Sequence, residues 1–196
     1  MDCLPLFYRR ILYAIAICVA FSLVSVAQPR PERAVAPLLK TIRVQSAPYN
    51  RSCPYYNYGD SISSEPCLVG CVATAIEQLL SYYRYPDALL DSIPGWETEN
   101  YSLVTVPSGS KIDWDDVADL SLWCGMIVQM KYSPSASASG MWKAEEPLKR
   151  VFGYGTVKIV DRSLYSFDAW HRILQNELLS GRPVAYVGYS NMMIGH

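Results

Sequence analysis

The chain has 196 residues, of which 18% are charged, and its formal net charge is −1 at pH 7. This length is sufficient for one domain with a substantial hydrophobic core. The balanced charge lacks the excess of Lys and Arg that a nucleic-acid-binding surface requires, so we expect no nucleic-acid partner.

The first 27 residues have the pattern of a secretory signal peptide. Two arginines precede an apolar run over residues 11–26, which ends in Ser25-Val26-Ala27 before a cleavage position after Ala27. The run is shorter than the ~20 residues that span a bilayer, which argues against a membrane anchor. We therefore expect residues 1–27 to be removed and the protein to be secreted or held in the cell envelope, with no stable membrane span.

Residues 28–44 have the composition of a linker. They contain three prolines with interspersed charges. The segment is too short to form a separate inhibitory module. We interpret residues 28–44 as a linker or vestigial pro-segment, followed by a domain over residues 45–196.

An amphipathic helix is predicted from Cys71 onward. Gly70 allows a sharp turn into it and Pro86 ends it. The apolar residues recur with the spacing i, i+4, i+7, i+8 and i+11, and four polar residues are expected on the outer face. The inner set is Val72, Ile76, Leu79, Leu80 and Tyr83, and the outer set is Glu77, Gln78, Ser81 and Arg84.

Cys71 is a candidate nucleophile because it lies at the start of this helix. Unpaired backbone N–H groups and the positive end of the helix dipole favour a thiolate at that position. The alternative is an inert core cysteine or one held in a disulfide, since cysteine is among the most buried residue types.

The candidate partner of Cys71 is His196, the last residue. The interval of 125 residues between them is close to the about 130–150 residues that separate cysteine and histidine in papain-like enzymes. An imidazole can accept the thiol proton and later protonate the leaving amine.

Three further cysteines remain after residue 27, namely Cys53, Cys67 and Cys124. A bridge between Cys53 and Cys67 would leave Cys71 free, but four cysteines allow three pairings, and these stay open. A zinc site is disfavoured because no C-x-x-C pair is present. We expect neither a metal nor a cofactor.

Four regular elements are predicted in the second half of the chain. A helix follows Asp113 and Trp114, with an apolar stripe that contains Cys124, and a second helix opens at Glu145. A strand is expected over residues 156–160, because apolar and polar residues alternate there. A third helix is expected from Ser166 to Leu179, with His171 as a structural residue.

Two segments of this half are expected to frame a site. Residues 133–140 are small and polar, which predicts an exposed loop. Residues 184–187 form a short apolar β-rich run, which predicts a strand leading into the hairpin that would present His196.

The sequence resembles the streptopain family of secreted bacterial cysteine peptidases over roughly residues 45–196. Six separated motifs keep their order, which makes the match specific. They are Gln45-Ser46-Ala47-Pro48-Tyr49-Asn50, Gly70-Cys71-Val72-Ala73-Thr74-Ala75 with Tyr85-Pro86, Asp113-Trp114, Tyr132-Ser133-Pro134-Ser135 through Gly140, Phe152-Gly153-Tyr154, and Gly181-Arg182-Pro183-Val184 leading to Gly195-His196.

The resemblance implies a papain-like α+β fold, with a helical N-terminal part and an antiparallel C-terminal sheet. It implies an endopeptidase for protein or peptide substrates that favours an apolar side chain two residues before the cut. Cys71 would be the nucleophile, His196 the general base and acid, and the loop at 133–140 would border the cleft. Gln45 would be the second oxyanion donor, although papain-like enzymes carry this glutamine six residues before the cysteine, where this chain has Glu65.

The family's chain continues past the histidine, so we expect the sheet to be incomplete and the domain C-terminally truncated, with weak or no activity. Two alternatives to a peptidase stay open at this stage. One is an inactive peptidase-derived fragment. The other is a peptide-binding or inhibitor module, in which Cys71 would be held in a disulfide.

Overall fold

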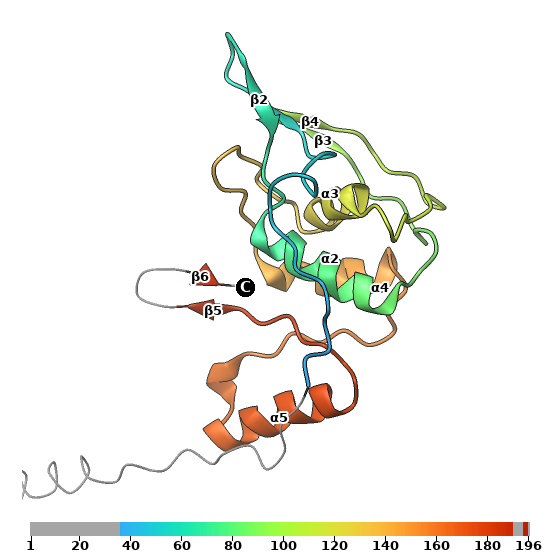
Figure 1. Ribbon diagram of the computed structural model, residues 1–196, viewed down its shortest axis with the longest axis vertical. Coiled ribbons are helices and arrows are strands. Elements are labelled where there is room, and N and C mark those ends of the chain that lie inside the picture. The colour runs from blue at the N-terminus through green and yellow to red at the C-terminus, as the bar shows by residue number, and fades with distance from the viewer. Residues whose placement is uncertain (1–35, 190–193, 196) are drawn as a thin grey trace, which may run out of the picture. The chain divides into compact units, whose positions relative to one another are not determined.

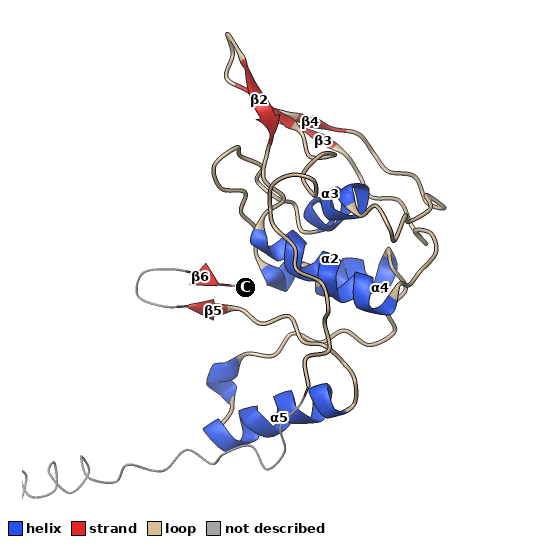
Figure 2. Ribbon diagram, viewed as in Figure 1, coloured by secondary structure: helices blue, strands red, loops and turns tan. Residues whose placement is uncertain are grey.

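The computed structural model describes residues 36–189, 194 and 195 (Figure 1). The expected signal peptide at 1–27, the first part of the expected linker and His196 all lie outside the described residues. Within the described part, helices carry most of the regular structure and every strand is short (Figure 2). No helix there is both long and apolar enough to cross a membrane.

Helices α2 (Cys71–Tyr83) and α3 (Ala118–Ile127) pack against each other and form the centre of the core. The predicted start of α2 at Cys71 is confirmed, and the helix ends at Tyr83, after which Arg84 adopts the left-handed conformation two residues before Pro86. The predicted α3 stripe is also confirmed. Its members are all buried: Val117, Leu120, Cys124, Ile127 and Val128.

Two predictions for α2 are wrong. Glu77, expected on the outer face, is 1% exposed, and Tyr83, expected on the inner face, is 42% exposed. Glu77 can be buried because it has charged and polar partners there. Tyr83 lies instead in an aromatic cluster, with its ring 5.8 Å from that of Tyr154.

The strands form three separate two-stranded antiparallel sheets. In the first, β1 (Tyr55–Asn57) pairs with β2 (Ile62–Pro66), and in the second, β3 (Trp96–Glu97) pairs with β4 (Ser102–Leu103). In the third, β5 (Gly188–Tyr189) pairs with β6 (Ile194–Gly195). The predicted hairpin before His196 is therefore present, but its strand begins at Gly188 rather than at residue 184.

The helix predicted at Glu145 is α4 (Glu145–Arg150), preceded by the 3₁₀ turn η1 (Met141–Lys143). Its expected apolar face is confirmed, because Leu148, Val151 and Phe152 are buried. The loop at 133–140 is only partly exposed, contrary to expectation. Ser137 is buried, because its hydroxyl donates to the Ser133 carbonyl and accepts from the Ser133 N–H.

The last helix, α5 (Phe167–Leu179), follows the 3₁₀ turn η2 (Arg162–Leu164) and begins where predicted. The hydroxyl of Ser166 caps it by accepting from the N–H of Ala169, and Gly181 follows its end with a φ of +71°. The strand predicted at 156–160 is absent. Ile159 and Val160 are exposed there, with no neighbouring strand in the described part of the chain to pair with.

Candidate active site

A cleft of about 530 Å³ lies beside the N-terminal half of α2. The α2 residues that line it share one helical face, with the spacing i, i+3, i+4 and i+7: Cys71, Thr74, Ala75 and Gln78. Residues 43–46 and Leu68 complete the lining. The cleft is thus formed by a helix start and by an extended segment that precedes it by about 25 residues in the chain.

Cys71 is half-buried and is the first residue of α2. The chain turns into the helix at Gly70, whose φ is +87°. A Cβ at this position would lie 2.7 Å from the sulfur of Met130 and 3.1 Å from the carbonyl oxygen of Ser137. Only glycine fits both the conformation and the space, so Gly70 places Cys71 directly at the helix terminus.

The backbone N–H groups at the start of α2 are not capped by a side chain. The Gly70 carbonyl accepts from both the N–H and the hydroxyl of Thr74, each at 3.0 Å, so the first turn is well formed. Free N–H groups and the positive end of the helix dipole favour negative charge at this end of the cleft. The site can therefore stabilise an oxyanion that forms on a bound substrate.

Gln45 lies beside the residues that lead into Cys71. Its carbonyl accepts from the N–H of Val69 at 2.9 Å, and the residue lines the same cleft as Cys71. Glu65, six residues before the cysteine, is exposed and lines a neighbouring cavity of about 770 Å³ near the β1–β2 hairpin. The fold thus brings Gln45, rather than Glu65, to the cleft that contains Cys71.

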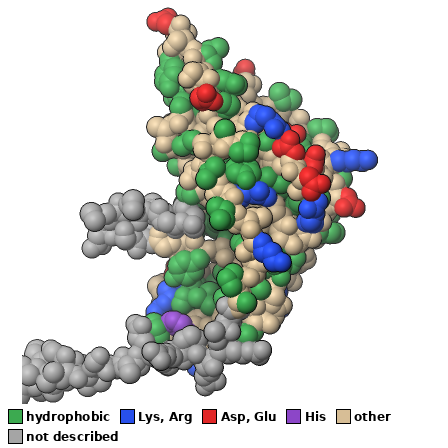
Figure 3. All heavy atoms as spheres, viewed as in Figure 1, with side chains coloured by type: hydrophobic (Ala, Val, Ile, Leu, Met, Phe, Trp, Pro, Cys, Tyr) green, Lys and Arg blue, Asp and Glu red, His purple; other side chains and the backbone are tan. Residues whose placement is uncertain are grey.

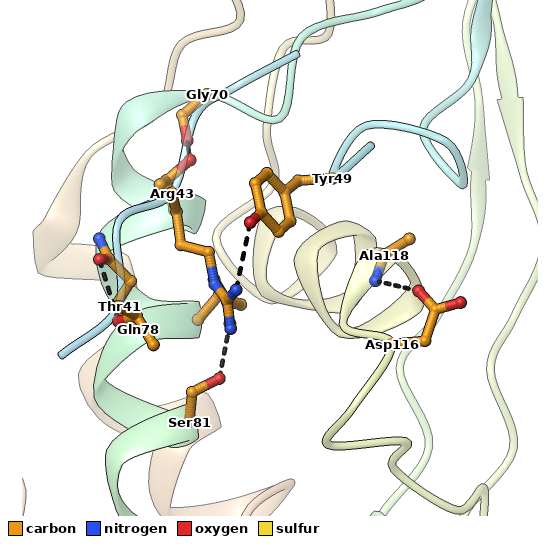
Figure 4. A network of polar contacts seen from close by, with 10 residues as sticks. Thr41, Arg43, Tyr49, Gly70, Gln78, Ser81, Asp116 and Ala118 are labelled. Atoms are coloured by element: carbon orange, nitrogen blue, oxygen red, sulfur yellow. Dashed lines mark hydrogen bonds and ion pairs between the residues drawn. The ribbon is translucent and has the colours of Figure 1, made fainter. Parts of the chain in front are cut away.

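Sequence reasoning missed an ion pair next to this cleft, of which Figure 4 labels the cation, Arg43. The Nε of Arg43 donates to a carboxylate oxygen of Glu77 at 3.2 Å, and the hydroxyl of Ser81 donates to the other oxygen at 2.6 Å. Arg43 also donates to the hydroxyl of Tyr49 at 3.3 Å, with its guanidinium 4.9 Å from the centre of that ring. A signal existed in the sequence, since Thr41, Arg43 and Gln45 alternate with apolar residues.

Burial raises the pKa of the Glu77 carboxyl above its usual value. The hydrogen bond from Ser81 and the charge of Arg43 lower it and offset part of this rise. The carboxylate is thus a costly buried charge whose place in the core depends on its partners.

The other thiols of the described chain differ sharply from Cys71. Cys53, Cys67 and Cys124 are all buried. Burial raises the pKa of Cys53 to about 12 and that of Cys67 to about 11, and it also raises the pKa of Cys124. All four cysteines are free thiols here, so Cys71 is the accessible one among them.

Of the two histidines, the structure describes His171 but not His196. His196 lies outside the described residues, directly after β6, whose Gly195 pairs with Gly188. His171 is half-buried on α5, as expected, with its Nδ1 2.9 Å from the carbonyl oxygen of Phe167.

The loop at 133–140 contacts the segment before Cys71. Its Ser133 carbonyl accepts from the N–H of Leu68 at 3.1 Å, and Pro134 lines the cavity that adjoins Leu68 and Ser46.

No cluster of three or more His, Cys, Asp or Glu side chains suited to a metal ion occurs within residues 36–189. On the face in Figure 3, Lys and Arg side chains lie among Asp and Glu side chains.

A sequence model described as the Peptidase C10 family matches residues 44–196. Streptopain from Streptococcus pyogenes is 26% identical over 172 aligned positions, which cover 74% of this chain and 43% of streptopain. The thiol protease/hemagglutinin PrtT from Porphyromonas gingivalis is also 26% identical, over 83% of this chain and 21% of its own. The chain therefore spans less than half the length of these curated relatives.

A solved structure gives the same relationship. Active wild-type interpain A, a cysteine protease from Prevotella intermedia, superposes with a TM-score of 0.70 at 27% identity, covering 85% of this chain and 76% of interpain A. A fragment of Prevotella intermedia prointerpain A also gives a TM-score of 0.70, at 25% identity over 96% of this chain. These likenesses confirm the predicted papain-like α+β fold and the resemblance to the streptopain family.

Proposed function

Because the chain belongs to the Peptidase C10 family, we propose that it is a cysteine endopeptidase that cuts proteins or peptides through Cys71. One observation carries the proposal. Cys71 is a free, partly accessible thiol at an uncapped helix start, inside a cleft that it shares with Gln45. The free thiol also counts against the alternative of a binding module with Cys71 in a disulfide.

The proposed reaction begins with attack of the Cys71 thiolate on the scissile carbonyl, and His196 holds the thiol proton. The resulting oxyanion accepts hydrogen bonds from the Cys71 backbone N–H and from the side-chain amide of Gln45. His196 passes its proton to the departing amine, which leaves an acyl-enzyme. A water molecule, deprotonated by His196, then attacks the acyl group and releases the acid and the thiol.

Location and specificity belong to the same proposal. Residues 1–27 act as a signal peptide, so that the enzyme is secreted or stays in the cell envelope. The cleft favours an extended peptide with an apolar side chain two residues before the cut, in line with the family resemblance.

A peptidyl epoxide that traps cysteine peptidases tests the proposal. Among the four cysteines of the described residues, we expect mass spectrometry to find the adduct on Cys71 alone, because Cys53, Cys67 and Cys124 are buried and burial raises the pKa of each thiol. Cys71→Ala should remove the adduct and lower hydrolysis of a fluorogenic peptide by ~10⁴-fold or more, while the melting temperature changes little. Labelling spread evenly over the cysteines, or turnover retained by Cys71→Ala, would contradict the proposal.

A further inference from the structure

We propose that Arg43 and Glu77 are positioning residues for the reaction: together they hold the segment that carries Gln45 against the nucleophile helix. This inference rests on the proposed function of the cleft. Arg43 lines the cleft, but the side-chain hydrogen bonds of Arg43 and Glu77 go to each other, to Tyr49 and to Ser81, so both residues act through Gln45.

The segment from Thr41 to Gln45 lies along α2 as an extended strap. Its side chains alternate: Thr41, Arg43 and Gln45 are partly buried, whereas Ile42 is 88% and Val44 is 48% exposed. Each of these inward residues forms a hydrogen bond to a different residue of α2 or of the segment just before it. Their partners are Gln78 for Thr41 at 3.3 Å, Glu77 for Arg43, and Val69 for the Gln45 backbone.

The order of these partners shows that the strap runs antiparallel to α2. Thr41, at the beginning of the strap, bonds to Gln78 in the second half of α2, whereas Gln45, at its end, bonds to Val69 just before the helix starts. The strap is therefore in a fixed register against the helix, and that register decides whether the Gln45 side chain reaches the end of the cleft with Cys71.

Arg43 fixes that register from both sides of Gln45. Its guanidinium bonds to Glu77 on α2 and also to the hydroxyl of Tyr49, four residues after Gln45. The backbone between them turns, because the N–H of Tyr49 donates to the carbonyl of Ser46 at 3.0 Å. Gln45 thus lies in a short loop between Arg43 and Tyr49, and the hydrogen bond from the Arg43 guanidinium to the Tyr49 hydroxyl, drawn in Figure 4, closes that loop.

Glu77 is the fixed end of this arrangement. It sits in the middle of a 13-residue helix and is 1% exposed, and both of its carboxylate oxygens accept hydrogen bonds. A rigid anion of this kind orients the planar guanidinium, whose donors have a fixed geometry. A mispositioned Gln45 would lose its hydrogen bond to the oxyanion while leaving the thiol intact.

The experiment compares two reactions of Cys71 in the 196-residue chain. Hydrolysis of a fluorogenic peptide needs the oxyanion donors, whereas alkylation by iodoacetamide needs only an accessible thiolate. We use Arg43→Met/Glu77→Gln as the main variant, because it removes both charges and leaves no lone buried one. We expect kcat to fall by ~10- to 100-fold with little change in KM and in the alkylation rate.

A double-mutant cycle with Gln45→Ala gives the decisive result. In the wild-type background Gln45→Ala should lower kcat by ~100-fold or more, the usual effect of losing one oxyanion donor. In the Arg43→Met/Glu77→Gln background it should lower kcat by no more than ~10-fold, because the donor is already misplaced. The control is Ile42→Ala, an exposed change on the same strap, which should leave both rates unchanged.

The failures of the two proposals are distinguishable. If the wild-type protein neither hydrolyses the peptide nor reacts at Cys71, the proposed function is overturned, and this inference with it. If the wild-type protein hydrolyses the peptide but Gln45→Ala lowers kcat by the same factor in both backgrounds, only the positioning role is overturned. A parallel fall of alkylation and kcat in the main variant would also overturn it, since that pattern indicates general loss of structure.

Discussion

Helices α2 and α5 are both 13 residues long and both show an amphipathic pattern, yet they are embedded very differently. α2 buries five residues: Val72, Ala73, Ile76, Glu77 and Leu80. α5 buries Trp170, and its other apolar residues stay partly exposed. The periodicity of a helix indicates which face turns inward, whereas the number of neighbours that reach that face is a property of the rest of the chain.

The neighbours explain the contrast. α2 contacts α3, the strap at residues 41–45, and the loop near Gly70. Around α5, the Trp170 ring lies 6.1 Å from that of Tyr165 and 6.0 Å from that of Tyr186. The helix that carries the nucleophile is therefore surrounded, which keeps Cys71 in place, while α5 depends on a small aromatic cluster.

The largest expected effect of a single substitution is on core packing. Ile76→Ala in α2 should lower the free energy of unfolding by about 3–4 kcal/mol, because Ile76 is 0% exposed and the truncation leaves a cavity. The matched change in α5, Leu174→Ala, should cost less than ~1.5 kcal/mol, because that side chain is only half-buried. Urea unfolding measures both. Equal costs would remove the distinction between the two helices.

The contrast between the pattern of a helix and its neighbours also explains which features could be predicted from the sequence. The bounds of α2 and α5, the α3 stripe and the place of Cys71 followed from periodicity and from Gly and Pro signals. The burial of Glu77 did not, because it depends on Arg43, which arrives from a segment that looked like a linker. The strand expected at 156–160 failed for a related reason: alternation alone does not supply a strand partner.

The next effect is a loss of stability at alkaline pH. The raised pKa values of Cys53 and Cys67 favour the protonated folded state. Above pH ~9 the unfolded chain loses these protons first, so stability is fully present below that pH and falls by ~1.4 kcal/mol per pH unit for each thiol as pH rises toward 11. Urea unfolding at a series of pH values measures this slope.

The control for the alkaline effect is Cys53→Ala/Cys67→Ala. Its stability should decline less steeply between pH 9 and 11 than that of the wild type, and comparing slopes cancels the constant cost of the truncations. Identical slopes would contradict the prediction, because they would mean that folding does not raise the pKa of these thiols. The effect belongs to the α2 side of the comparison, because Cys53 and Cys67 lie in the same buried cluster as Ile76 of α2, and this cluster contains no α5 residue.

A smaller effect is expected at the start of α5. Ser166→Ala removes the hydroxyl that accepts from the N–H of Ala169 and should cost about 1 kcal/mol. Hydrogen exchange should show faster exchange in the first turn of α5 and no change in α2. A uniform change across both helices would mean that they unfold as one unit.

The smallest effect concerns a link between the two helices. The hydroxyl of Tyr82, near the end of α2, donates to the carbonyl of Gly181 after α5 at 3.0 Å. Tyr82→Phe should cost only about 0.5 kcal/mol, because the group is partly exposed and water can replace the bond. Faster hydrogen exchange confined to the residues that follow α5 would show that this bond stabilises only the local structure. A large loss in the free energy of unfolding would contradict that interpretation.

The strap also limits how far the N-terminus can be trimmed. A cut after Arg43 would remove the cation that faces Glu77 and leave a buried carboxylate whose loss of a partner costs about 3–5 kcal/mol. A maturing protease could therefore shorten this chain as far as Thr41 at little cost, but not past Arg43. The mature N-terminus is thus expected at or before residue 41, earlier than the linker composition of residues 28–44 suggested.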